Sequence, residues 1–147
     1  MGSGEAAVTR SDVSDKAAFV REALEELAAI PQGTLDEFLA DRRNLPSALH
    51  WLQTAIQALI DIGLILVAAR GLPAPRSSAD VLECLEAAEL LPPGSAAKYR
   101  AAIGFRNRVV HLYDRIDPEI VYRVVREDRD DLAQLLALVL ASANPPA

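Results

Sequence analysis

The sequence predicts an all-α protein: a single domain over residues 1–147, built as an antiparallel bundle of about five helices. Hydrophobic residues make up 51% of the chain but aromatic residues only 5%, so the apolar content is Ala, Leu, Ile and Val, as in packed helices. Apolar residues recur at helical spacing, and Gly and Pro fall between those segments. A chain of 147 residues is long enough for one core and too short for two.

The first two helices are predicted on either side of Pro31-Gln32-Gly33. One runs from about Asp12 to Ile30, and residues 1–11 before it are expected to be disordered or derived from an expression vector. Its apolar face is expected to comprise Ala17, Phe19, Val20, Leu24 and Leu27. Thr34-Leu35-Asp36-Glu37 has the form of a capping box and begins a short helix to about Arg43.

A long third helix is predicted from Pro46, which suits a first turn, to Arg70, where Gly71 ends it. Its second half is almost wholly apolar, so we expect it to be central and buried on more than one side. Its apolar set is Leu49, Leu52, Ile56, Leu59, Ile60, Leu66 and Val67. The uninterrupted apolar stretch, 62–69, is shorter than the roughly 20 residues that span a membrane, so no membrane association is expected.

Three capping signals divide the rest of the chain. Ser77-Ser78-Ala79-Asp80 is expected to cap a fourth helix reaching Leu90, and Ser95 a fifth from Ala96 to about Tyr113. Asp117-Pro118-Glu119 begins a last helix to about Ser142. The residues of this last helix that are expected to face inward are Ile120, Val121, Val124, Val125, Leu132, Leu135, Leu136 and Val139.

The net charge of −6 argues against a nucleic-acid partner, but the charge is unevenly distributed. Residues 98–129 hold eight basic and five acidic residues, a balance of +3, which leaves −9 for the rest. If the chain has a phosphate-contacting surface, we expect it in residues 98–129. The alternative is that this segment is an ordinary solvated face of mixed charge. Cys84 is alone and is interpreted as a small core side chain, which suits a reducing cytoplasm. No ligand spacing for a metal or motif for a cofactor is found.

The residues suited to chemistry are gathered around His111. On a helix, Arg106, Asn107, His111 and Tyr113 fall within an arc of about 160°. A permanent cation, an amide, a near-neutral acid/base and a phenol thus share one face. RNA cleavage without a metal needs proton transfer to and from the reacting oxygens and a fixed positive charge for the phosphorane. Imidazole, with a pKa of about 6.5, and guanidinium provide these. The alternative is a buried Arg/His pair that holds the helix in place.

The segment Arg106-Asn107-Arg108-Val109-Val110-His111-Leu112-Tyr113 resembles the R-x(4)-H-x-Y signature of HepT-like proteins of the HEPN superfamily. The resemblance covers about Asn44 to Leu140. It includes the long helix with its internal aspartate, Asp61, the sequence Gly71-Leu72-Pro73 and the stretch from Tyr113 to Tyr122.

This resemblance implies a homodimeric, metal-independent endoribonuclease, the toxin of a type VII toxin–antitoxin pair, with a composite site at the dimer cleft. Arg106 and His111 would be the catalytic pair, Asn107 would orient them or the RNA, and Arg108 would contact phosphate. The implied partner is an MntA-like nucleotidyltransferase antitoxin that adenylylates Tyr113. Bulk and negative charge would then occupy the place of the RNA phosphate.

Two further polar residues and two other functions remain open. Asp61 is expected to hold Arg106 or Arg108, or else to reach solvent. His50, beside Trp51, is interpreted as a surface or capping residue. The alternatives to a ribonuclease are a non-catalytic module that binds a nucleotide or presents Tyr113 to a nucleotidyltransferase, and a purely structural dimerisation bundle.

Overall fold

The computed structural model describes the backbone of residues 3–111 and 116–143, with the side chains of these residues except 3–10, 79 and 106–111. Within these ranges there are seven α-helices, one 3-10 turn and no strand, which confirms the all-α class. The elements are α1 (Ser3–Ala29), α2 (Leu35–Ala40), α3 (Asn44–Ala69), η1 (Ser78–Asp80), α4 (Val81–Ala87), α5 (Ser95–His111), α6 (Pro118–Glu127) and α7 (Arg129–Ala143).

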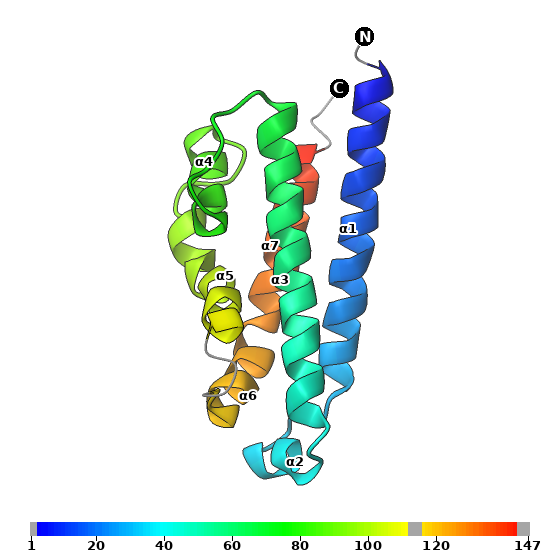
Figure 1. Cartoon of the computed structure of the whole chain (residues 1–147), viewed down its shortest axis with the longest axis vertical. Helices are drawn as coiled ribbons and strands as arrows, with labels where there is room; N and C mark the ends of the chain where they lie inside the picture. Colours follow the sequence, from blue (N-terminus) through cyan, green and yellow to red (C-terminus); the bar gives the residue numbers. More distant parts are fainter. Residues whose placement is uncertain (1–2, 112–115, 144–147) are drawn as a thin grey trace.

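The long helices run alternately up and down along the molecule (Figure 1). In Figure 1, α1 descends, α3 ascends beside it, α5 descends on the other side of α3, and α7 ascends behind, as in an antiparallel bundle. The short helix α2 lies at the lower end, where α1 leads into α3, and it packs against α6.

Helix α3 is the centre of the bundle, as its sequence predicts. It packs against α1, α2, α4, α5, α6 and α7, and every residue of its predicted apolar set is buried. Among the described helices, α3 is the one that is long and apolar enough to cross a membrane. More than half of its most apolar stretch, however, is buried inside the protein. Its apolarity is therefore accounted for by its central place in the core.

The observed helices differ from the predicted ones at several boundaries. Helix α1 begins at Ser3 rather than near Asp12, so residues 3–11 are helical rather than disordered. After Gly4 the helix contains neither Gly nor Pro, the two residues that most disfavour a helix interior. Helix α2 ends at Ala40 because Asp41 is extended (φ −109°, ψ 114°). The predicted last helix is two helices, α6 and α7, which meet at Asp128.

Two side chains predicted to face inward are exposed. Phe19 is 50% exposed and Ile120 is 40% exposed. The core stripe of α1 is formed by Val13, Ala17 and Val20, and Phe19 projects about 100° away from Val20 around the helix. Phe19 is expected on the core side because it is apolar, but its position around the helix lies outside that stripe.

Three predicted helix ends are confirmed, those at Thr34, Asp117 and Gly71, whereas the fourth helix ends at Ala87 rather than Leu90. Thr34 Oγ1 accepts a hydrogen bond from the Glu37 backbone at 3.1 Å, and the Asp117 carboxylate accepts one from the Glu119 backbone at 2.9 Å. Gly71 ends α3 with φ +65°, a conformation that favours glycine. Ser77 makes no side-chain cap. Its hydroxyl donates to the Asp80 carboxylate at 3.3 Å, and η1 precedes α4.

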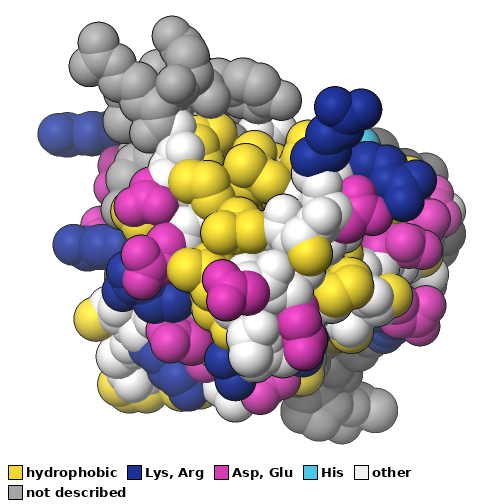
Figure 2. Space-filling view, turned by 90° about the horizontal axis from the view of Figure 1, so that it is seen from below, with side chains coloured by type: hydrophobic (Ala, Val, Ile, Leu, Met, Phe, Trp, Pro, Cys, Tyr) yellow, Lys and Arg dark blue, Asp and Glu magenta, His cyan; other side chains and the backbone are white. Residues whose placement is uncertain are grey.

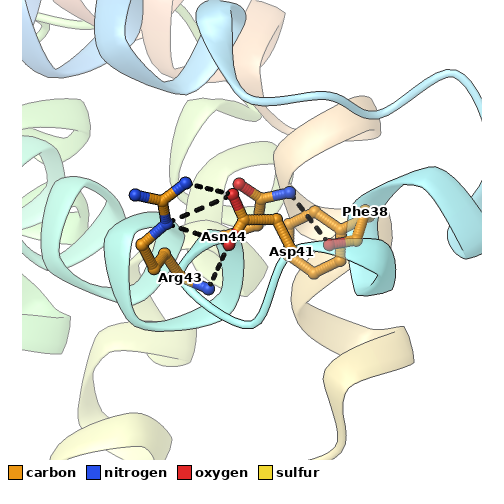
Figure 3. A network of polar contacts seen from close by, with 4 residues as sticks. All are labelled: Phe38, Asp41, Arg43 and Asn44. Atoms are coloured by element: carbon orange, nitrogen blue, oxygen red, sulfur yellow. Dashed lines mark hydrogen bonds and ion pairs between the residues drawn. The ribbon is translucent and has the colours of Figure 1, made fainter.

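The turn between α2 and α3 is fixed by two polar contacts (Figure 3). The Asp41 carboxylate accepts hydrogen bonds from the Arg43 backbone at 2.9 Å and from its guanidinium Nη2 at 2.8 Å. The hydrogen bonds from the Arg43 side chain, followed by that from its backbone, lower the pKa of Asp41 to about 2. The buried Asn44 side chain donates to the Phe38 carbonyl at 3.0 Å. This connection is therefore a defined turn that sets the start of α3.

Candidate functional site

The predicted catalytic motif lies at the C-terminal end of α5. The backbone is helical from Ser95 through His111, so Arg106 and His111 are five positions apart on the helix, about 7.5 Å along the axis. The side chains of Arg106, Asn107, Arg108 and His111 lie outside the described residues, and so does Tyr113. What the structure supplies is the helix that carries the motif and the contacts that fix that helix.

The upstream half of α5 is anchored in the core. Tyr99, Ala102, Ile103 and Phe105 are buried, and the helix packs against α3, α4 and α7. Arg106 comes seven residues after Tyr99 and three after Ile103. Its Cα atom therefore lies on the side of α5 on which these two buried residues pack against the bundle. The packing of the residues that precede Arg106 thus fixes how the helix that carries the motif is oriented about its axis.

The start of α5 is capped from another helix. The Glu86 side chain of α4 accepts a hydrogen bond from the Ala96 backbone N–H at 2.9 Å. Ser95, the residue predicted to cap this helix, instead donates its hydroxyl to the Pro92 carbonyl at 2.6 Å. The sequence did not predict this role of Glu86, because it depends on α4 packing beside α5. The contact is favourable because a carboxylate is stabilised at the N-terminus of a helix.

The chain resumes after the motif at a second fixed point. Asp117 caps α6, and Tyr122 of α6 packs on Phe38 of α2 with ring centroids 5.7 Å apart. Helix α6 also packs against α3 and α7. Tyr113, which lies outside the described residues, thus falls in the sequence between two described helices that are both packed on α3.

Several basic residues of the segment 98–129 make contacts within the protein. Lys98 donates to Gln134 at 2.9 Å, Arg126 to the Tyr122 hydroxyl at 2.7 Å and Arg129 to Gln32 at 3.0 Å. Arg100 forms an ion pair with Glu83. Among the described part of this segment, Arg123 is left without a hydrogen bond or ion pair. The local excess of positive charge therefore serves partly to join helices, as the alternative interpretation of an ordinary mixed-charge face expects.

Asp61 has partners on its own helix and on α1. Its Oδ2 lies 3.2 Å from Lys16 Nζ, and its Oδ1 accepts a hydrogen bond from Gln57 at 2.8 Å. Its side chain is 28% exposed. The predicted pairing with Arg106 or Arg108 involves side chains outside the described residues. The described contacts account for a carboxylate at this position without it.

His50 is exposed, as predicted, and lies edge-on to Trp51 with ring centroids 4.7 Å apart. It lines a groove of about 410 Å³ between α1 and α3. The other lining residues are Lys16, Phe19, Gln53, Thr54, Gln57, Ala58 and Asp61. Among the residues that the structure describes, no three His, Cys, Asp or Glu side chains are grouped as a metal site would require.

Comparisons with known proteins agree with this architecture. Residues 20–139 match the family described as Ribonuclease HepT-like. The chain is 25% identical to the mRNA nuclease HepT of Shewanella oneidensis over 129 residues, which cover 88% of this chain and 96% of that protein.

Solved structures show the same fold. The tri-AMPylated HEPN toxin of Shewanella oneidensis in complex with its MNT antitoxin superposes with a TM-score of 0.78 at 25% identity, covering 88% of this chain and 97% of that one. A toxin–antitoxin complex with AMP-PNP gives a TM-score of 0.77 at 23% identity, covering 87% and 97%. With the family match extending over most of its length, and its motif helix in place at α5, this chain belongs to the HepT-like ribonuclease family.

Proposed function

We propose that this chain is the toxin of a type VII HepT/MntA-like toxin–antitoxin pair and acts in the cytoplasm as a metal-independent endoribonuclease. The observation that carries the proposal is the placement of Arg106 and His111 on one anchored helix, α5, within a chain of the HepT-like ribonuclease family. The mRNA nuclease activity named for the Shewanella oneidensis relative supports the choice of RNA as substrate.

The proposed reaction is cleavage of an RNA phosphodiester by its own 2′-hydroxyl. A base removes the 2′ proton, O2′ bonds to phosphorus, and the P–O5′ bond breaks as an acid protonates the departing 5′-oxygen. The products are a 2′,3′-cyclic phosphate and a 5′-hydroxyl. His111 transfers protons, because imidazole titrates near working pH. Arg106 stabilises the charge on the phosphorane, Arg108 contacts phosphate, and Asn107 orients the reacting groups.

This reaction favours a homodimer with a composite site. Two proton transfers are needed, one at each reacting oxygen, and the motif provides one imidazole per chain. Two copies that place their motif helices across a shared cleft would supply a base and an acid together. The proposal needs no metal, since two imidazoles and two guanidinium groups supply both proton transfer and charge.

The proposed regulator is an MntA-like nucleotidyltransferase that adenylylates Tyr113. The Shewanella oneidensis neighbour carries AMP groups and is bound to an MNT antitoxin, which supports the same partner here. A phosphodiester attached two residues from His111 adds negative charge and bulk where a substrate phosphate would bind.

One observation favours a second candidate, a non-catalytic module that binds a nucleotide or presents Tyr113 to its partner. Four of the five described basic side chains in the segment 98–129 are engaged within the protein, and the net charge is −6. Both features weaken the attraction for RNA that an extended phosphate-binding surface would provide.

Cleavage of a labelled RNA by the purified chain and its variants tests the proposal. Arg106→Ala and His111→Ala should each reduce the rate by about 10²–10⁴-fold, and the double variant should be hardly slower than either. Arg76→Ala, which removes an exposed cation from the connection between α3 and η1, is the matched control and should cleave normally. Circular dichroism checks the fold, and EDTA should leave the rate unchanged. Full activity of both motif variants would refute the ribonuclease assignment.

A further inference from the structure

Gly104 lies in the middle of α5, the helix that carries the motif. After proline, glycine is the residue that most disfavours the interior of a helix, so a glycine at such a position calls for a packing or a functional reason. The backbone conformation does not supply one. The described glycines with a positive φ are Gly71 and Gly94, and the backbone at Gly104 is ordinary helix.

Gly63, in the middle of α3, has a packing reason that Gly104 lacks. A Cβ atom at Gly63 would lie 2.9 Å from Val81 Cγ2, so α4 approaches α3 closely where this side chain is absent. At Gly104, apart from its chain neighbours and the backbone of its own helix, no atom of the described residues lies within 4 Å of an added Cβ. The described part of the chain therefore leaves space beside Gly104 that it does not itself fill.

The backbone register places Gly104 on the same side of α5 as His111. Seven positions separate the two residues, which on a helix is a rotation of about 20° and a rise of about 10.5 Å. This side of α5 faces solvent in the preceding turn, where Arg100 and Ala101 are exposed. Arg100 forms its ion pair with Glu83 of α4. The bare backbone at Gly104 thus lies on the solvent-facing side of α5, two turns before the motif histidine.

The surface at the motif end of the molecule offers RNA no continuous basic patch in its described part. Figure 2 shows this end from below, and on it acidic side chains lie among the basic ones. Much of a protein's attraction for nucleic acid comes from cations placed at the phosphates. Here the cations assigned to that role, Arg106 and Arg108, belong to α5 itself. A strand held by contacts on one helix must come close to that helix, and glycine permits the close approach of a ligand to the backbone.

The other occupant that would fit beside Gly104 is the motif helix of a second copy. Residues 106–111 contain two arginines and a histidine and no acidic residue. Two such segments in direct contact would bring like charges together, since the same surface meets itself in a two-fold pair. An anionic strand is therefore the better match for this side of α5.

We propose that Gly104 is a substrate-accommodating residue, whose missing side chain lets the RNA strand beyond the cleaved phosphodiester lie against the backbone of α5. The inference rests on the proposed ribonuclease function and adds to it a residue that determines how the continuing strand is bound. Because Gly104 lies about 10.5 Å before His111 along the helix, the strand reaches it only past the phosphodiester that is cleaved.

Cleavage of a long and a short substrate by Gly104→Gln tests this role. Glutamine is neutral and favours a helix, so the variant should fold. For a labelled RNA of about 20 nucleotides, kcat/KM should fall about 100-fold, because displacement of a bound substrate by about 1 Å has an effect of that order. Cleavage of UpA, a dinucleoside monophosphate with a single phosphodiester, should proceed at the wild-type rate. Gly104→Ala, which adds one carbon, should lose less on the long RNA.

The matched control is Ala97→Gln. It adds the same side chain to an exposed position on the same side of α5, two turns further from His111. This variant should cleave both substrates as the wild type does. The melting temperature of Gly104→Gln should be no lower than that of the wild type, which separates a role in binding RNA from a role in packing.

A binding measurement does not depend on catalysis. A fluorescein-labelled 2′-O-methyl RNA of the same sequence lacks the attacking 2′-hydroxyl and is not cleaved. Its fluorescence anisotropy should give a dissociation constant at least tenfold higher for Gly104→Gln than for the wild type and Ala97→Gln.

Three results would overturn the inference. Equal cleavage of the long RNA by Gly104→Gln and the wild type would show that no strand lies against Gly104. An equal loss on UpA, together with a higher dimer dissociation constant in sedimentation equilibrium, would assign the space to a second copy. A lower melting temperature of Gly104→Gln and Gly104→Ala would assign it to packing within the chain.

The outcomes separate this inference from the proposed ribonuclease. If the wild type cleaves RNA and Gly104→Gln cleaves it equally well, the inference is wrong and the proposed function stands. If the wild type binds the 2′-O-methyl RNA, loses that binding in Gly104→Gln and cleaves no RNA, the role of Gly104 stands and the ribonuclease assignment is wrong.

Discussion

Glu86 and Ala96 join two helices through a single hydrogen bond. The Glu86 carboxylate of α4 accepts from the Ala96 backbone N–H at the start of α5, with 2.9 Å between Oε1 and N. The helix that carries Arg106 and His111 therefore begins on a cap supplied by its neighbour. The same pair of helices is joined a turn later by Arg100 and Glu83.

Removal of this cap should destabilise the fold. Glu86→Ala leaves the Ala96 N–H without its acceptor, and loss of a helix cap costs about 0.5–2 kcal/mol. Glu86→Gln retains a carbonyl oxygen and should lose less. The free energy of unfolding from urea titration followed by circular dichroism measures both. Equal stability of Glu86→Ala and the wild type would show that solvent replaces the carboxylate.

Two glycines in helices should respond to alanine in opposite directions. A methyl group at Gly63 would lie 2.9 Å from Val81 Cγ2, at the contact between α3 and α4. Gly63→Ala should therefore destabilise the protein by about 1–3 kcal/mol. At Gly104 the added carbon meets no atom within 4 Å apart from its chain neighbours and the backbone of its own helix, so Gly104→Ala should stabilise α5 by about 0.5–1 kcal/mol. Thermal melting of both variants compares the two, and a gain in stability at Gly63 would contradict the close packing.

The sequence predicted features of the fold that depend on short-range patterns. The apolar set of α3, the Thr34 and Asp117 caps and the Gly71 stop are all set by residues within one or two helical turns. Features that depend on which helices become neighbours were not predicted. The cap from Glu86 needs α4 beside α5, and the Lys16–Asp61 ion pair needs α1 beside α3.

The candidate site was predicted as a motif, and its helix was predicted with it. The fifth helix was placed from Ala96 to about Tyr113, and α5 spans Ser95–His111. The motif residues stay functional predictions, because their roles depend on side-chain orientation and on a second copy. The expected partner of Asp61 shows that contacts between residues far apart in the chain are hard to predict from the sequence. Sequence reasoning considered the motif arginines, whereas the described carboxylate pairs with Lys16, 45 positions earlier in the chain.

The Lys16–Asp61 pair should contribute little to stability. Both side chains are partly exposed, at 38% and 28%, and such ion pairs contribute about 0.2–1 kcal/mol. A double-mutant cycle with Lys16→Met and Asp61→Asn measures their coupling through urea unfolding. If Asp61→Asn instead reduces RNA cleavage while its coupling to Lys16 stays small, Asp61 acts through the motif arginines.

Asp128 should make stability fall as pH rises. Its burial, followed by the nearby charges of Asp131 and Glu127, raises the pKa of this carboxyl above its ordinary value of 3.8. The folded state then binds the proton more tightly than the unfolded state, so deprotonation above about pH 4 destabilises the fold. Asp128→Asn keeps the shape and removes the charge. It should melt at a higher temperature than the wild type at pH 7 and lose this advantage at pH 3. A constant difference across that range would contradict the prediction.

Tyr113→Phe should separate cleavage from its control. The substitution removes the hydroxyl that would accept AMP and leaves the ring, so the variant should fold, retain RNA cleavage within about tenfold and stay toxic when the neighbouring nucleotidyltransferase is co-expressed. The wild type should be silenced under the same conditions and gain the mass of AMP on the peptide that contains Tyr113. Tyr122→Phe is the matched control, because its hydroxyl is already engaged by Arg126 at 2.7 Å. It should still be silenced.

If Tyr113→Phe is silenced and modified as fully as the wild type, the modified residue lies elsewhere in the chain. If it loses its toxicity without the partner present, the phenol takes part in the cleavage itself.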